Sequence, residues 1–253
     1  TTGWTFSPTT TTTYTLTATG GGCSTTAQVV VTPVALPVIS IATPAAVCVG
    51  NSSTLTALTP VIGAGTGTFG TGALTSSSTG ASMFPGAWGG TKSQYLIKAS
   101  ELTALGFAAG NLTSVAFEPT TSGQTYQGFS LSIGTTAATA LTSTFLANGT
   151  QVYAGTLTDN GFTPVANTVN TLAFGTGSGS ASSFAWDGTS NIVLTFSWSR
   201  VPSATTATGS TMKSDAVGFV CTTYKQADSQ APAAMLAQAT GTTSSNRPRF
   251  TFG

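Results

Sequence analysis

The stretch that decides the fold is FAWDGTSNIVLTFSW, residues 184–198. Inside it, Asp187-Gly188 predicts a turn, because glycine accepts positive φ and the aspartate side chain can bond its own backbone. After the turn, large apolar residues occupy every second position: Ile192, Leu194, Phe196 and Trp198. Side chains along a strand point alternately to opposite faces. This period of two therefore predicts a strand with one heavy face packed on a core.

Charge is scarce throughout the chain. Of 253 residues only 5% are charged, against about 25% in ordinary soluble domains. The length allows one large sandwich or two domains. A net charge of +1 predicts no nucleic-acid partner, because a nucleic-acid surface needs a basic patch. It also offers little repulsion between copies, which permits self-association.

Histidine is absent from the chain. A Ser-His-Asp triad, a Cys-His pair and a histidine metal ligand are therefore excluded. We expect no enzymatic activity, no cofactor and no metal. The longest uncharged apolar stretch, residues 29–49, contains three prolines and alternates like strands, so we expect no membrane span. The chain opens without a signal peptide, and we expect it to be a segment of a longer protein.

The N-terminal region predicts two strands around a glycine turn. Residues 14–19 place Tyr14, Leu16 and Ala18 on one face, residues 20–24 form the turn, and residues 27–32 form the second strand. The threonine run before Tyr14 could also be a low-complexity linker. Alternation on both flanks favours strands.

The larger region, residues 59–253, predicts a sandwich. One short helix is expected over residues 99–106, with Ser100 as its cap and Gly106 as its stop. Short strands separated by turns favour an all-β sandwich of jelly-roll type. We expect these strands over residues 95–98, 111–118, 128–133, 151–155, 169–174, 191–198, 216–221 and 249–252.

Two N-terminal stretches carry a resemblance to a known family. SPTTTTTYTLTATGGGCSTTAQVVV, residues 7–31, resembles the C-terminal half of Ig-like repeats in giant secreted surface proteins of Bacteroidota. Residues 37–57, which contain PVISI and VCVGNSSTLTA, resemble the N-terminal half of the same repeat. The resemblance therefore divides this region into a C-terminal half (1–33) and an N-terminal half (34–58), in reversed order. Either the halves form a permuted Ig-like sandwich within one chain, or each completes a domain with a neighbouring repeat.

Three cysteines, Cys23, Cys48 and Cys221, are too few and too scattered for a zinc or iron–sulfur site. In a charge-poor β chain they indicate disulfide candidates from an oxidising compartment. In the Ig-like family a cysteine ahead of the second strand bridges one in the glycine turn. The matching positions here are Cys48 and Cys23, so the resemblance implies a Cys23–Cys48 disulfide.

Residues 95–119 and 184–198 together resemble a second module of Bacteroidota surface proteins, which are exported by the type IX secretion system. This resemblance implies an extracellular, cell-surface location. The sorting domain expected at the C-terminus of such proteins is absent, which again suggests an internal segment.

The acidic residues suggest two kinds of polar site, a glycosidase pair and a calcium site. Glu101 and Glu118 are the only glutamates and could form a glycosidase pair, but Glu101 suits the first turn of the expected helix and Glu118 ends a strand. A calcium site lacks the DxDxDG spacing, and Asp-Gly turns are ordinary in sandwiches. The aspartates that could gather are Asp159, Asp187, Asp215 and Asp228.

Three tryptophans, Trp88, Trp186 and Trp198, could form a sugar-stacking face. Trp198 continues the apolar face of its strand, so a core position is favoured there. Trp88 lies among glycines and is the better candidate for exposure.

These patterns favour a structural repeat of an extracellular filament or giant cell-surface adhesin. Its partners would be other copies or neighbouring repeats, and surface glycans. The alternative from a different class is a carbohydrate-binding module, which a jelly roll permits by fold analogy. A hydrolase ranks third.

Overall fold

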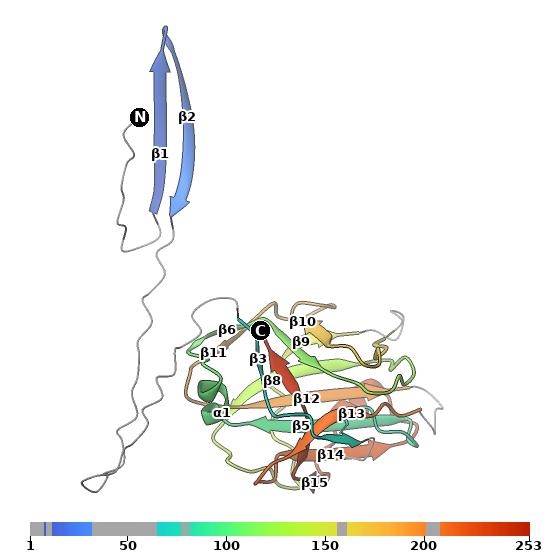
Figure 1. The fold of residues 1–253 in the computed structure, drawn as a ribbon. Coiled ribbons are helices and arrows are strands. Elements are labelled where there is room, and N and C mark those ends of the chain that lie inside the picture. The colour runs from blue at the N-terminus through green and yellow to red at the C-terminus, as the bar shows by residue number, and fades with distance from the viewer. Residues whose placement is uncertain are drawn as a thin grey trace, which may run out of the picture.

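The computed structural model describes residues 8, 12–31, 65–76, 80, 82–155, 161–200 and 208–253. These residues form an all-β protein of mainly antiparallel strands with two short helices (Figure 1). The described part of the chain contains no helix that is long and apolar enough to cross a membrane.

The N-terminal element is a two-stranded hairpin of β1 (Thr12–Gly20) and β2 (Cys23–Val31). Its turn is shorter than predicted, because Gly20 pairs with Cys23 and only Gly21 and Gly22 lie outside the ladder. Both turn residues have positive φ, 60° and 84°. Two such residues match the twist of a right-handed hairpin, and glycine adopts them without strain. The Ig-like assignment stays a prediction, since residues 34–58 lie outside the described residues.

Two main sheets form the larger unit, which runs from Gly67 to Phe252. The smaller of them has the order β10-β7-β17-β3 and the larger β15-β14-β5-β12-β8-β9. The first contains β3 (Gly67–Thr68), β7 (Ser114–Phe117), β10 (Asn170–Ala173) and β17 (Phe250–Phe252). The second contains β5 (Gly90–Ile97), β8 (Ser130–Thr136), β9 (Thr150–Ala154), β12 (Asn191–Ser199), β14 (Thr222–Ala227) and β15 (Thr242–Ser244).

The strand order is that of a jelly roll. Counted along the chain as first to eighth, β3, β5, β7, β8, β9, β10, β12 and β17 give the orders 1-8-3-6 and 2-7-4-5 in the two sheets. This is the double Greek key of eight-stranded jelly rolls, so the predicted architecture is confirmed. Smaller sheets complete the unit: β4 (Leu74–Ser76), β13 (Met212–Ala216) and β16 (Asn246–Pro248) form one, and β6 (Gly110–Leu112) and β11 (Phe184–Trp186) another.

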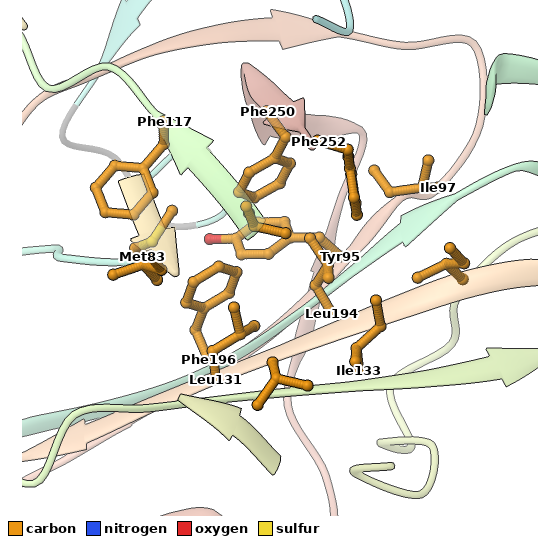
Figure 2. Packing of buried hydrophobic residues seen from close by; sticks show 14 of the residues in the cluster. Met83, Tyr95, Ile97, Phe117, Leu131, Ile133, Leu194, Phe196, Phe250 and Phe252 are labelled. Atoms are coloured by element: carbon orange, nitrogen blue, oxygen red, sulfur yellow. The ribbon is translucent and has the colours of Figure 1, made fainter. Parts of the chain in front are cut away.

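The core lies between the two main sheets, and β12 is central to it. Its heavy face is buried as predicted, with Ile192, Leu194, Phe196 and Trp198 each at most 1% exposed. Phe196 stacks on Phe250 of the opposite sheet with a centroid distance of 5.8 Å. Figure 2 shows side chains of both sheets meeting here, with Leu131 beside Phe196 and Phe117 facing them. These contacts make the alternating strand the packing centre of the domain.

The lighter face of β12 is buried as well. Thr195 is fully buried, and its hydroxyl accepts a hydrogen bond from the Gln94 amide at 3.0 Å. The same amide group bonds the backbone of Leu146 in both directions, at 2.8 and 2.9 Å. Helix α2 (Pro232–Leu236) also packs on β12 and β5. Alternation alone does not predict this second covering layer.

Helix α1 (Ala99–Ala104) occupies the predicted place, but its cap was wrong. Ser100 lies inside the helix, whereas the cap is Lys98, whose backbone is extended. An N-cap must have non-helical dihedrals, and Ser100 has no such backbone. Gly106 follows the helix at φ +86°, as the predicted stop requires. The second helix, α2, was not predicted; it begins with Pro232, a residue suited to a first helical turn.

The strand predicted over residues 216–221 was also wrong. β13 ends at Ala216 and β14 begins at Thr222, so the apolar stretch between them is a connection. The flanking strands, MKSDA and TTYKQA, are polar, yet they pair with β4, β16, β5 and β15. Sheet pairing overrode local apolarity here, because β propensity depends on the neighbouring strands.

Candidate functional site

The hairpin presents an apolar face to solvent. Register places Tyr14 opposite Val29 and Leu16 opposite Ala27, with all four on one face. Leu16 is 64% exposed and Val29 is 55% exposed. A two-stranded hairpin is at best marginally stable alone in water. This face therefore has the character of a contact surface that needs a covering layer.

The opposite face of the hairpin carries hydroxyl and amide groups. The Gln28 side chain donates to the Thr15 hydroxyl at 3.2 Å across this face. Such groups can stay in water without loss, so the two faces have different roles. The polar residues on this face are Thr13, Thr15, Thr17, Thr19, Ser24, Thr26 and Gln28. One apolar residue, Val30, also lies on it, opposite Thr13 near the end of β2, and is 61% exposed.

The edge of the hairpin adds a second contact feature. Within the described residues, β1 and β2 form a sheet of two strands, so nothing there extends the β2 edge. In the larger sheet of the jelly roll, by contrast, the edge formed by β9 is covered. Beyond β9, Ala154 donates to the Thr176 carbonyl at 2.9 Å and Gln151 accepts from the Ala181 amide at 2.9 Å. An uncovered edge is a template for another strand, which makes β2 the better candidate for pairing.

The two described cysteines lie in different surroundings, one of them on the hairpin. Cys23 is exposed and directly follows the turn, whereas Cys221 is buried in the jelly roll. Burial raises the pKa of the Cys221 thiol, which makes it a poor nucleophile. No disulfide forms among the described residues. The predicted partner of Cys23, Cys48, lies outside them, so this disulfide stays a prediction.

The two glutamates are not brought together as an acid–base pair; each one meets its own cations. Glu101 pairs with Arg247, whose guanidinium also donates to the Leu96 carbonyl at 2.8 Å. Glu118 pairs with Lys213 and lies 3.6 Å from Arg249. These ion pairs fit the structural roles that the sequence favoured.

The aspartates are distributed over separate loops. Asp187 closes its turn by accepting from the Thr189 and Ser190 amides at 2.8 and 2.7 Å, as predicted. Hydrogen bonds from Ser190, its hydroxyl first, lower the pKa of Asp187 to about 2. Asp215 accepts from the Thr71 amide at 3.0 Å, and Asp159 lies outside the described residues. Across the described ranges, no three His, Cys, Asp or Glu side chains gather where they could hold a metal.

The tryptophans do not form one face. Trp198 is fully buried and its indole donates to the Met83 carbonyl at 2.8 Å. Trp186 is 2% exposed and donates to the Ser190 carbonyl at 2.8 Å. Trp88 is 42% exposed, as the sequence favoured.

Lys92 is a buried cation that the sequence did not indicate. Lys92 lies on the outer face of β5 at 3% exposure, and its ammonium donates to the Leu236 and Gln238 carbonyls at 2.7 and 2.9 Å. It also lies 4.4 Å from the centre of the Phe145 ring. Burial lowers the pKa of Lys92 to about 8. The lysine ties the C-terminal end of α2 to the sheet, and no local pattern could have revealed it.

Comparison with known proteins found no match to a family model, to a previously described protein or to a solved structure.

Proposed function

We propose that this chain is a structural repeat of an extracellular filament or giant cell-surface adhesin. It assembles with other copies or neighbouring repeats through β-sandwich contacts. The observation that carries the proposal is the hairpin, whose exposed apolar face around Leu16 and Val29 adjoins the β2 edge, which no strand of the described residues extends. The capped β9 edge of the jelly roll supports the hairpin as the joint.

The occupant of this surface is residues 37–58 of the next copy or repeat. Their sequence alternates, with Ile39, Ile41 and Leu55 on apolar faces. As one or two added strands, they would give the hairpin the third strand and the covering layer that an independent sheet needs. Their own structure lies outside the described residues, so this pairing rests on their sequence and on the hairpin that would receive them.

Chemistry elsewhere in the chain agrees with a mechanical role. The net charge of +1 gives copies little mutual repulsion. A Cys23–Cys48 disulfide across the joint would stabilise it by about 2–4 kcal/mol. Such a bond persists in the oxidising space outside a cell, which supports the extracellular location that we propose.

The test compares assembly of the chain and two variants by sedimentation velocity and electron microscopy. Leu16→Lys places a charge on the apolar face, and Thr17→Lys places the same charge on the hydroxyl face. We expect the unmodified chain and Thr17→Lys to form concentration-dependent linear assemblies, and Leu16→Lys to stay monomeric. A chain that remains monomeric at high concentration, or equal assembly of both variants, would contradict the proposal.

A further inference from the structure

A second surface lies on the loop between residue 82 and β5. Trp88 is 42% exposed there, while the loop that carries it is anchored deep in the core. Phe84 is fully buried and stacks on Tyr126 with a centroid distance of 4.2 Å. The Phe84 carbonyl also accepts from the Ser210 amide at 2.9 Å. The exposed indole is therefore carried by a loop that is fixed to the core through Phe84.

The backbone just before Trp88 is strained. Ala87 has φ +75°, a left-handed conformation that alanine adopts only at a cost. Its side chain cannot compensate with a hydrogen bond, as Asn or Ser can. Such strain persists where the surroundings over-determine it, and it clusters at ligand sites. Hydrogen bonds fix the backbone on both sides of Ala87 and Trp88. The Gly86 carbonyl accepts from the Gln226 side-chain amide at 3.3 Å, and the Gly89 backbone amide donates to the Asp228 carboxylate at 2.9 Å.

Polar groups lie around the loop that carries Trp88. The Gly89 carbonyl accepts from the Arg200 backbone amide at 2.8 Å. The Arg200 guanidinium donates to the side-chain oxygen of Gln124 at 3.3 Å. The Gln124 amide nitrogen is buried, with no hydrogen-bond partner among the described residues. Only one oxygen of Asp228 receives the Gly89 amide. The loop thus has a carboxylate and a side-chain amide, those of Asp228 and Gln226, bonded to the backbone on either side of Trp88.

This combination matches the chemistry of a sugar ring. The C–H face of a pyranose packs on an aromatic platform, whose apolar body suits it. Ring hydroxyls donate to a carboxylate and accept from a side-chain amide. An apolar protein partner would leave these polar groups unsatisfied. The negative charge of Asp228, bonded to the residue after Trp88, disfavours an acidic sugar and so favours a neutral one.

We propose that the Trp88 loop binds a neutral pyranose of a polysaccharide. Trp88 is the platform, and Asp228 and Gln226 take the ring hydroxyls. This function is independent of the hairpin joint, because it uses the far part of the chain and requires no second copy. A filament repeat with such a loop would bind polysaccharide along its length.

Affinity electrophoresis of the full chain tests the site, with dextran, galactomannan, xylan and the acidic polysaccharide alginate as probes. The variants are Trp88→Ala, Asp228→Asn and the control Val165→Ala, which truncates an apolar side chain elsewhere that is even more exposed (57%). Circular dichroism checks that each variant is folded. We expect at least one neutral polysaccharide to retard the chain, and Trp88→Ala to weaken this retardation at least tenfold. Asp228→Asn should weaken it less, and Val165→Ala should not change it.

Three results would overturn the site. They are no retardation by any neutral polysaccharide, retardation that survives Trp88→Ala, and retardation by alginate alone. Loss of self-association in Trp88→Ala without any effect on polysaccharide binding would instead mark the loop as a protein contact. Assembly through the hairpin is measured separately, so either proposal can fail without the other.

Discussion

Arg247 and Glu101 form an ion pair in which the cation is almost wholly inside the protein. The Arg247 side chain is 4% exposed and that of Glu101 is 26% exposed. One guanidinium nitrogen donates to Glu101 at 3.0 Å and to the Leu96 carbonyl at 2.8 Å. The pair thereby connects β16 to α1 and β5, two neighbouring elements that lie far from β16 in the chain. Its integrity should matter more to stability than any other ion pair described here.

Glu101→Gln should lower the free energy of unfolding by about 3 kcal/mol, because it leaves Arg247 buried without its counter-charge. The matched control is Glu118→Gln. Its partners Lys213 and Arg249 are 39% and 26% exposed and can stay hydrated, so we expect a loss of about 1 kcal/mol or less. Urea unfolding followed by tryptophan fluorescence measures both. Equal losses in the two variants would show that burial of Arg247 does not set the strength of its pair.

Two buried tyrosines provide a second matched comparison. The Tyr126 hydroxyl donates to the Thr208 carbonyl at 2.7 Å. The Tyr95 hydroxyl interacts with the Ser93 side chain but makes no hydrogen bond of ordinary geometry in the described structure. Tyr126→Phe should cost about 1 kcal/mol. Tyr95→Phe should be neutral or stabilising, because it removes a buried polar group that is not satisfied. A clear loss of stability in Tyr95→Phe, measured by urea unfolding, would contradict this assignment.

Lys92 makes stability depend on pH in the alkaline range. Its pKa falls from 10.5 to about 8 in the folded chain. Between these values the unfolded chain binds more protons than the folded one, so the Lys92 contribution to stability rises with pH. The contribution is complete above the unfolded pKa and is lost as pH falls through about 8.

The measurement compares the unmodified chain with Lys92→Met by urea unfolding at pH 7, 8.5 and 10. Subtraction removes the other titrating groups, which both proteins share. We expect the difference to shift in favour of the unmodified chain as pH rises. A difference that does not change with pH would show that the buried amine keeps its ordinary pKa.

The Cys23–Cys48 disulfide distinguishes two ways in which Ig-like halves could pair. If copies exchange residues 37–58, oxidative co-assembly of isotope-labelled and unlabelled chains should give mixed light–heavy Cys23–Cys48 peptides. Mass spectrometry under non-reducing conditions detects them. Peptides that are purely light or purely heavy would favour a permuted sandwich within one chain, and the exchange between separate copies would then be wrong.

Local pattern was sufficient for several elements. The period of two in residues 191–198 predicted β12 and its buried face. The glycine-rich residues 20–24 predicted the hairpin turn, which is shorter in the structure. These features depend on neighbours within a few residues, because side-chain direction along a strand and backbone freedom at glycine are local properties. The short strands separated by turns, with one short helix among them, likewise predicted an all-β sandwich.

Other features depended on contacts between distant residues. The ion pair of Glu101 joins residues 146 positions apart, and Lys92 finds its carbonyl partners 144 and 146 positions away. Residues 216–221 appeared apolar enough for a strand, yet the polar segments on either side entered the sheets. Sequence periodicity describes one strand face at a time, whereas the jelly roll brings separated strands and loops together. Which polar side chain is buried, and which partner it meets, is therefore decided only when the sheets pack.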